Sequence, residues 1–355
     1  AVDEVERGGL SVEKHDTITG STPQGDADFE GITFQIINNS RNPVMVEGQK
    51  YQPGEVVKTL VTDSEGKAST ADDLLPYGEY ILRESATNES MLLTAPDQTV
   101  LVEDDGVMYE FTMADEVVRG GVLIEKRDLE SGLLTPLGGA SLDGTLFEIT
   151  NQSKNAVYVG GALYQPGEVC ATIEVVDGIA QTDARALPYG TYQMVESKPG
   201  EGYLHTDQTV RSFQIRKDGE VIEFRDGDAA YNQVIRGDLQ FVKVGEGGES
   251  NMHRFANVAF KLISETTGEE HIVVTDENGE VRTETEWNPH SQNTNGNDGV
   301  EDEAAWDDHA GTWFGLTTEG WMVDVQDELC ALPYDTYTLE ELPCEGNQGY
   351  ELVKV

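Results

Sequence analysis

The chain has 355 residues, enough for two or three domains, and its 67 acidic and 23 basic side chains give a formal net charge of -44. This balance excludes nucleic acid and anionic membrane surfaces as partners, because both are bound through basic patches. No apolar run is long enough to span a membrane, and neither a signal sequence nor a sorting signal is present, so we expect a fragment excised from a longer protein.

Three segments of the chain repeat one another, which is the strongest organisational signal in the sequence. An Arg-Gly pair opens each segment, at Arg7-Gly8, Arg119-Gly120 and Arg236-Gly237. A Leu-Pro-Tyr motif returns late in each segment, at residues 75–77, 187–189 and 332–334. The spacing is about 115 residues, which is the size of a domain and too long for a solenoid repeat.

Each segment is predicted to be all-β. Short runs of alternating apolar residues are separated by turn signals such as Ser64-Glu65-Gly66-Lys67, and no run sustains the apolar stripe of a helix. The expected fold is therefore a row of immunoglobulin-like β-sandwich domains in tandem. The predicted bounds are 1–7 for the last strand of a preceding domain, 8–118 and 119–235 for two complete domains, and 236–355 for a third with a long insertion and no last strand.

The first strand of each domain ends in a lysine on the face that should be buried. In residues 121–126, Val122, Ile124 and Lys126 share one parity, and a strand sends alternate side chains to opposite faces. Lys14 and Lys243 occupy the same position in the other two domains. A buried ammonium is very unfavourable unless it meets a carboxylate or loses its proton, so a lysine repeated there indicates a chemical role.

Acidic and amide side chains break the apolar pattern at two further positions. A glutamate lies on the apolar face of the strand after Leu-Pro-Tyr in every domain: Glu84, Glu196 and Glu341. The last strand adds Asp115 in the first domain and Asn232 in the second. The third domain has its lysine and glutamate but no acceptor on a last strand.

Two interpretations fit a buried lysine, glutamate and Asp or Asn. The simpler one is a buried ion pair with an amide neighbour, which is weak evidence for stability because desolvation can cancel the Coulomb gain. The sharper one is covalent. In an apolar pocket the pKa of lysine falls and that of glutamate rises, so a neutral amine could attack the side-chain carbonyl of Asn232 or of protonated Asp115 while the glutamic acid shuttles protons. The product is an amide cross-link, with ammonia or water released.

With these residues in place, the first two domains resemble Cna protein B-type domains, the prealbumin-like sandwiches of Gram-positive surface adhesins and SpaA-type pilins. The resemblance rests on the first-strand lysine, the late glutamate in residues 80–84 and 192–196, and the last-strand Asp or Asn. It implies spontaneous intramolecular isopeptide bonds. The implied pairs are Lys14–Asp115 assisted by Glu84 and Lys126–Asn232 assisted by Glu196.

The third domain resembles the VaFE repeat of surface-anchored proteins. The matching stretches are residues 258–260, 287–291, 293–298, 311–315 and 331–341. The sequence departs from the repeat at Cys330, where a glycine usually precedes Ala-Leu-Pro-Tyr.

These resemblances imply a structural stalk of an adhesin or pilin-like protein that is secreted and anchored to the cell wall of a Gram-positive bacterium. The cross-linking is a single intramolecular event, so we expect no enzyme and no cofactor. A host or matrix ligand would be held by another part of the full-length protein. The alternative is an adhesin module that binds a ligand through the Trp-rich insertion of the third domain, by Trp287, His290, Trp306 and Trp313, rather than packing these residues as a small core.

The N-terminus suggests a contact between copies of the chain. Residues 3–9 match residues 115–121, with Asp3 in the place of the last-strand Asp115. A strand of another copy that carries Asp3 could therefore complete the third domain by donor-strand complementation, which predicts a head-to-tail contact.

Metal and disulfide signals are weak. Oxygen-bearing side chains alternate over residues 293–297 as in a calcium loop, but Asp298 occupies the position of its glycine, and no histidine spacing supports zinc. We therefore expect no metal site. Cys330 and Cys344 could pair around a hairpin or remain ordinary thiols.

Overall fold

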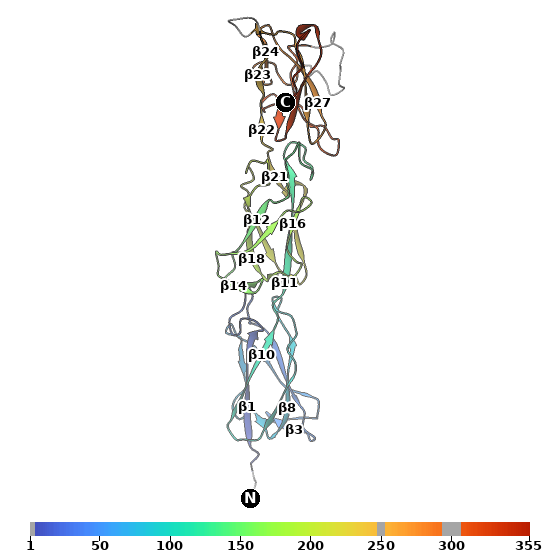
Figure 1. Cartoon of the computed structure of the whole chain (residues 1–355). Coiled ribbons are helices and arrows are strands. Elements are labelled where there is room, and N and C mark those ends of the chain that lie inside the picture. Colours follow the sequence, from blue (N-terminus) through green and yellow to red (C-terminus); the bar gives the residue numbers. More distant parts are fainter. Residues whose placement is uncertain (1–3, 247–252, 293–306) are drawn as a thin grey trace.

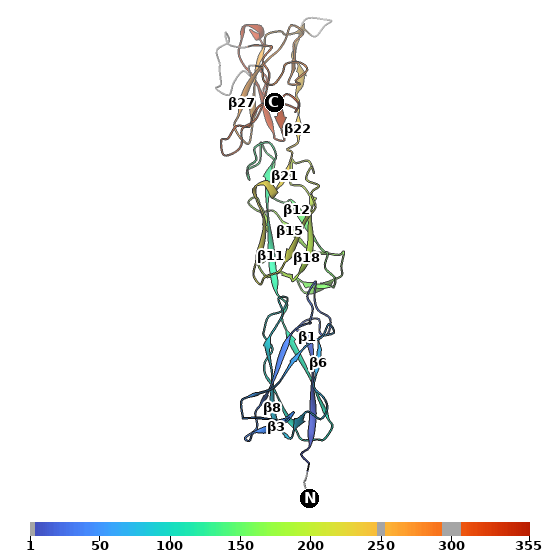
Figure 2. The ribbon, with the colours of Figure 1, turned by 180° about the vertical axis from the view of Figure 1, so that it is seen from behind.

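The computed structural model describes residues 4–246, 253–292 and 307–355. It is nearly all-β, with 45% of the chain in strands and 2% in helices, which confirms the predicted fold class. Three units follow one another in a row that is much longer than it is wide, as Figures 1 and 2 show from opposite sides. We call residues 8–118 unit one, 119–235 unit two and 236–355 unit three. In the described part of the chain, no helix has the length and apolar character needed to cross a membrane.

Unit one consists of two sheets and a hairpin. Its strands are β1 (Arg7–Asp16), β2 (Thr33–Asn38), β3 (Val44–Val46), β4 (Gln49–Tyr51), β5 (Val56–Val61), β6 (Lys67–Ser69), β7 (Leu75–Pro76), β8 (Gly78–Ala86), β9 (Gln98–Val102) and β10 (Met108–Asp115). One sheet places β1 between β10 and β6, with β7 also paired to β1. The other runs in the order β5-β2-β8-β9, and β3 pairs with β4.

Unit two repeats this arrangement. Its elements are β11 (Arg119–Asp128), β12 (Leu146–Asn151), β13 (Val157–Val159), β14 (Ala162–Tyr164), β15 (Val169–Glu174), β16 (Ile179–Gln181), β17 (Leu187–Pro188), β18 (Gly190–Lys198), β19 (Arg211–Ile215), β20 (Val221–Phe224), the 3-10 turn η1 (Asp226–Asp228) and β21 (Ala230–Asn232). β11 pairs with β16, β17, β20 and β21, and the facing sheet runs β15-β12-β18-β19. The last strand of unit one thus corresponds to two shorter strands, β20 and β21.

Unit three has shorter strands and smaller sheets. Its described elements are β22 (Arg236–Gly237), β23 (Gln240–Val242), β24 (Val244–Gly245), β25 (His253–Arg254), β26 (Ala259–Ser264), β27 (Glu270–Val274), β28 (Glu280–Arg282), β29 (Leu332–Pro333), β30 (Tyr337–Glu341) and the 3-10 turn η4 (Glu345–Asn347). One sheet runs β27-β26-β30, and the pairs β22-β29, β23-β28 and β24-β25 form the rest.

The first and last strands of units one and two lie side by side and run in the same direction. β1 pairs with β10 from Gly9↔Met108 to Asp16↔Asp115. In unit two, β11 pairs first with β20 and then with β21, up to Asp128↔Asn232. Because Lys14 lies two residues before Asp16, its side chain and that of Asp115 face the same interior.

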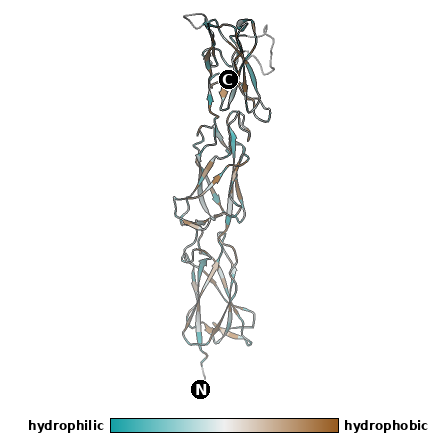
Figure 3. Ribbon diagram, in the orientation of Figure 1, coloured by the Kyte–Doolittle hydropathy of each residue, from teal (hydrophilic) through white to brown (hydrophobic). Residues whose placement is uncertain are grey.

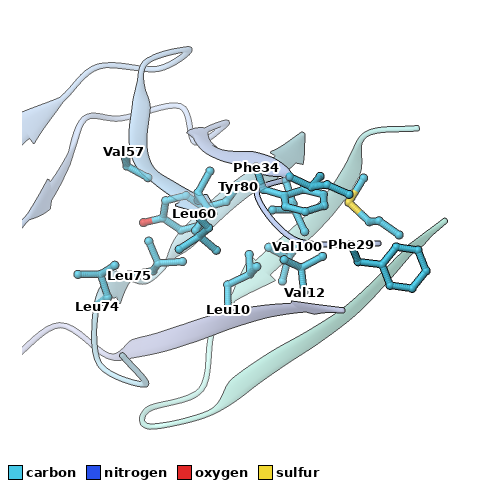
Figure 4. Packing of buried hydrophobic residues seen from close by; sticks show 14 of the residues in the cluster. Leu10, Val12, Phe29, Phe34, Val57, Leu60, Leu74, Leu75, Tyr80 and Val100 are labelled. Atoms are coloured by element: carbon cyan, nitrogen blue, oxygen red, sulfur yellow. The ribbon is translucent and has the colours of Figure 1, made fainter. Parts of the chain in front are cut away.

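Alternating apolar residues build the interior around these strands. In Figure 4, Leu10 and Val12 of β1 point toward Phe34 and Tyr80 of the facing sheet, and all four are buried. Unit two packs an equivalent cluster around residues 122–124 of β11. Apolar stretches occur along the whole length of the molecule in Figure 3, because every unit has an interior of its own.

Units one and two meet through a loop of unit one. The buried side chain of Gln24 accepts a hydrogen bond from the backbone N–H of Tyr158 at 3.0 Å and from the Arg119 guanidinium at 3.3 Å. The next residues bond to unit two as well, with the carboxylate of Asp26 3.1 Å from Arg216. These contacts tie the loop to the start of β11, to the β13-β14 hairpin and to the residue that follows β19.

Units two and three share a packed joint. The Arg236 guanidinium lies 2.7 Å from the carboxylate of Glu130, and these side chains are only 3% and 1% exposed. Its other face lies 3.8 Å from the centre of the Trp313 ring. One apolar cluster spans the joint, composed of Leu137, Ala140, Leu142, Tyr203, Val234, Trp313 and Val323. Neighbouring units are therefore held by interfaces rather than by free linkers.

Candidate cross-linking sites

In unit one, a buried glutamate stands between a lysine and an aspartate. Lys14 comes from β1, Glu84 from β8 and Asp115 from the end of β10. Nζ of Lys14 lies 2.8 Å from Oε2 of Glu84 and 2.8 Å from Oδ2 of Asp115. All three side chains are completely shielded from solvent.

The pKa shifts of this carboxyl pair favour a proton on Glu84. Burial and the hydrogen bond with Asp115 raise the pKa of Glu84 to about 7. Burial would also raise the pKa of Asp115, but the hydrogen bonds with Glu84 and Lys14 outweigh it and lower that pKa. Oε1 of Glu84 and Oδ2 of Asp115 form no hydrogen bond, although Nζ of Lys14 lies 2.8 Å from Oδ2, and one proton shared between the two carboxyls would satisfy both oxygens.

Unit two has the same arrangement with an amide as acceptor. Nζ of Lys126 lies 2.6 Å from Oε2 of Glu196, and Nδ2 of Asn232 donates to Oε1 of the same carboxylate at 2.5 Å. The lysine and the asparagine are fully buried. Burial lowers the pKa of Lys126 despite the opposing charge of Glu196, which favours the neutral amine.

Backbone N–H groups hold the carbonyl oxygen of each acceptor, a feature that the sequence analysis missed. Oδ1 of Asp115 accepts from the N–H of Thr94 at 2.8 Å and of Ala95 at 2.6 Å, and from the Thr94 hydroxyl at 3.0 Å. Oδ1 of Asn232 accepts from the N–H of Thr206 at 3.2 Å and of Asp207 at 2.9 Å, and from the Thr206 hydroxyl at 3.3 Å. Donors placed on an oxygen in this way stabilise negative charge that develops on it.

The sequence contains only a misleading signal for these donors. Asp-Gln-Thr-Val occurs at residues 97–100 and again at 207–210. Aligning the two copies puts Thr206 opposite Pro96 rather than opposite Thr94, so the equivalence of the two threonines emerges only from the structure.

In unit three, the predicted lysine and glutamate also meet. Nζ of Lys243 lies 2.7 Å from Oε2 of Glu341, the lysine side chain being 11% exposed and the glutamate buried. The second oxygen of Glu341 accepts from Nδ2 of Asn347 at 3.0 Å. Asn347 was not among the predicted site residues, because it lies in a 3-10 turn and not on a strand.

The edge of β23 that a last strand would cover is open in the described part of unit three. β28 pairs with one edge of β23. A largely apolar groove of about 730 Å³ extends along this region, lined by residues of 235–244, 332–339 and 353–355 together with Phe260 and Leu262. Gly120 and Gly237 hold equivalent positions at the start of units two and three. A Cβ added to Gly120 would lie 2.7 Å from the carbonyl oxygen of Glu220, just before the last strands of unit two, whereas a Cβ added to Gly237 would have no atom within 4 Å.

The aromatic residues of the insertion are mostly interior in the described part of the chain. His290 is fully buried, with one ring nitrogen 3.1 Å from the carbonyl of Gln326 and the other 2.9 Å from that of Thr283. Trp313 is 2% exposed, and Trp287 is half-buried under the Arg282 guanidinium. These contacts account for His290 and Trp313 as packing residues.

Some predicted features lie outside the described residues. These are Asp3, Trp306 and the possible calcium loop at 293–298. Within the described residues, no group of His, Cys, Asp and Glu side chains is arranged to hold a metal ion. Cys170, Cys330 and Cys344 are free thiols, so the possible Cys330–Cys344 disulfide is absent.

Comparison with known proteins identifies related domains. The sequence model of the family described as "SpaA: Prealbumin-like fold domain" matches residues 10–117 and 137–228, together more than half of the chain. No curated protein sequence matches the chain.

Solved structures align with the chain at low sequence identity. The Bacillus anthracis TIE protein aligns with 99% of this chain and 48% of its own, at 18% identity and a TM-score of 0.54, so this chain spans about half of that protein's length. GBS52, the minor pilin of Streptococcus agalactiae, aligns with 65% of this chain and 97% of its own, at 15% identity and a TM-score of 0.27. The shaft pilin SpaA from Lactobacillus rhamnosus GG aligns with 65% of this chain and 98% of its own, at 13% identity and a TM-score of 0.24.

Proposed function

The chain belongs to the SpaA family of prealbumin-like fold domains, and we propose that it is part of the stalk of a Gram-positive surface protein, pilin-like or adhesin-like, whose units lock themselves with isopeptide bonds. The observation that carries this proposal is the shared carboxylate. In units one and two, the lysine of the first strand and the Asp or Asn of the last strand meet at one buried glutamate. The pairs are Lys14 with Asp115 and Lys126 with Asn232.

In unit two, the reaction would join Lys126 to Asn232 with release of ammonia. The neutral amine attacks Cγ of Asn232, and the carbonyl electron pair moves to Oδ1, where two backbone N–H groups and a hydroxyl already donate. Glu196 takes a proton from Nζ at Oε2 and one proton passes from Oε1 to Nδ2, so that ammonia leaves and the side chain of Glu196 returns to its starting state. Each site reacts once, since the product stays in the chain.

In unit one, the leaving group is the second carboxyl oxygen. Nζ of Lys14 bonds to Cγ of Asp115 while Oδ1 stays on its backbone donors. Oδ2 leaves as water, carrying one proton from the amine and one from Glu84, which ends as a carboxylate. The raised pKa of Glu84 supports this role, because the group keeps a transferable proton near neutral pH.

The rest of the molecule fits a stalk outside the cell. Each bond would join the first strand of a unit to its last, and closing a loop of ~100 residues stabilises a fold by roughly 4–5 kcal/mol in the chain-entropy treatment of a disulfide. An amide, unlike a disulfide, resists reduction. The packed joints align the units, and the net charge of -44 would keep neighbouring stalks apart. We place the protein at the cell wall, with any host ligand bound elsewhere in the full-length protein.

Intact mass under denaturing conditions tests the proposal. The wild-type chain should weigh less than its sequence predicts by at least one water, from unit one, and one ammonia, from unit two. Lys14→Arg should restore only the water, and Lys126→Arg only the ammonia. A wild-type mass equal to that of the uncrosslinked sequence would overturn the proposal.

A further inference from the structure

Unit three contains a third set of residues with the same connectivity. Lys243 approaches Oε2 of Glu341 at 2.7 Å, and Asn347 donates to Oε1 of the same carboxylate at 3.0 Å. Lys126 and Asn232 divide the two oxygens of Glu196 in the same way. In both units, one buried glutamate therefore contacts an amine through one oxygen and a carboxamide through the other.

The amide of Asn347 is buried and oriented. The residue is 3% exposed. Its Oδ1 accepts from the backbone N–H of Cys344 at 2.9 Å, as Oδ1 of Asn232 accepts from a backbone N–H at 2.9 Å. Its Nδ2 also donates to the carbonyl of Leu342 at 2.8 Å. A backbone donor thus polarises the carbonyl, while the nitrogen that would leave faces the carboxyl group of Glu341.

The position of Asn347 in the fold differs from that of the other acceptors. It lies in η4, six residues after Glu341, and not on a last strand. Glu341 is positioned by Val353, because its backbone N–H donates to the carbonyl of Val353 at 2.8 Å and the N–H of Val353 donates to Oε2 at 3.0 Å. The segment between Lys243 and the turn nevertheless encloses nearly all of unit three, as in the other units.

We propose that Lys243 and Asn347 form a third amide cross-link. This inference rests on the proposed function. Nζ of Lys243 bonds to Cγ of Asn347, and the Cγ–Nδ2 bond breaks. Glu341 takes a proton from Nζ at Oε2 and one proton passes from Oε1 to Nδ2, which leaves as ammonia, so the side chain of Glu341 is unchanged overall. The cross-link would thus join Lys243, which follows β23, to the 3-10 turn η4, and no acceptor on a last strand would be needed.

Peptide mapping of the whole chain tests this inference. We expect proteolysis of the wild type to yield one branched peptide that contains Lys243 and Asn347, lighter by one ammonia than the two peptides together. The same digest reports on Lys14–Asp115 and Lys126–Asn232 in the same molecules. Lys243→Arg should release the Asn347 peptide and leave the other two cross-links intact.

Asn347→Asp supplies a second readout that does not depend on mapping. Ammonia leaves from Asn and water from Asp, so the cross-linked wild type and the cross-linked variant are the same molecule with the same mass. Asn232→Asp is the matched reference in unit two. Without a bond, the variant differs from the wild type by the exchange of NH2 for OH.

The outcomes separate this inference from the proposed function. If the peptides of Lys243 and Asn347 are recovered separately while units one and two are cross-linked, the inference is wrong and the proposed function stands. A branched peptide that joins Lys243 to another residue also overturns the inference. If no unit is cross-linked, both are wrong.

Discussion

The backbone N–H of Asp207 donates to Oδ1 of Asn232 over 2.9 Å. Ala95 holds Oδ1 of Asp115 in the same way at 2.6 Å. This relationship fixes which atom of each acceptor is the carbonyl and which is the leaving group. The oxygen on the backbone donors remains, and the atom that faces the glutamate departs. It also prepares the position where negative charge would develop during attack by the lysine.

Removing the hydroxyl from this donor set should slow the cross-linking. In Thr206→Val the backbone N–H remains, but Oδ1 of Asn232 loses its hydroxyl contact at 3.3 Å. Because two of the three donors remain, we expect the rate of ammonia release to fall by at most about tenfold. Removal of a dominant oxyanion-hole donor lowers a rate by more, about 10²–10³-fold. The chain would be synthesised in denaturant and refolded, and the cross-linking would be followed over time by mass spectrometry. The rate at which unit one loses water serves as the internal reference. Equal slowing of both units would instead indicate a folding defect.

The joining of Lys14 to Asp115 should depend on pH through Glu84. The pKa of Glu84 is raised to about 7 by burial and by the neighbouring Asp115. The proton that it gives to the leaving oxygen is therefore present below that pH and lost above it, so the rate should fall as pH rises through about 7. The same refolding assay, run in buffers on both sides of this value, measures the effect. A rate that climbs steadily into alkaline pH would contradict a proton donor at Glu84.

Loss of one cross-link should destabilise its unit by several kcal/mol. Asn232→Ser removes the acceptor but keeps the buried pair of Lys126 and Glu196. Closing a loop of ~100 residues contributes ~4–5 kcal/mol in the chain-entropy treatment, so we expect a loss of this size in the free energy of unfolding, measured by guanidinium titration. Lys198→Arg, an exposed change on the same strand as Glu196, is the matched control. Equal stability of the two variants would argue against a bond in unit two.

The joint between units two and three should loosen when its buried ion pair is broken. Glu130→Gln leaves the Arg236 guanidinium without its carboxylate at a site only 3% exposed. Breaking a buried pair on one side costs about 3–5 kcal/mol. We expect faster proteolysis within residues 233–238 and a broader distribution of shapes in solution scattering. Glu116→Gln, which breaks an exposed pair with Arg185 at the other joint, should change neither measurement.

The groove beside β23 leads us to propose that another copy of the chain adds a strand there. Residues 3–9 repeat the sequence of 115–121, which begins with Asp115 at the end of the last strand of unit one. We therefore expect head-to-tail association that increases with concentration in light scattering after size exclusion, and a loss of it when residues 1–6 are deleted. Monomers at every concentration would contradict this proposal.

The alternation of strands made the lysines and glutamates predictable from the sequence. Lys14 and Glu84 each continue an apolar row, and a period of two left no other face for them. The structure places both in the interior, 2.8 Å apart. Asp115 likewise continues an apolar row on its own strand, and this pattern identified the last strand from the sequence.

Other parts of the sites lay beyond what sequence patterns encode. Every residue has a backbone N–H, so the donors of Thr94 and Ala95 depend on the path of a loop and not on residue type. Asn347 reaches Glu341 through a single 3-10 turn, and such a turn has no apolar period to mark it. His290 and Trp313 follow no strand pattern either, so their burial depended on tertiary packing.

The parallel alignment of β1 with β10, and of β11 with β20 and β21, has a mechanical consequence. Tension enters each unit through its first strand and leaves it through its last. With the cross-links in place, the force would travel from Arg7 to Lys14, cross to Asp115, continue to Lys126 and cross to Asn232. All residues between the members of each pair lie off this route. They would remain folded under load, and the rod would keep its length.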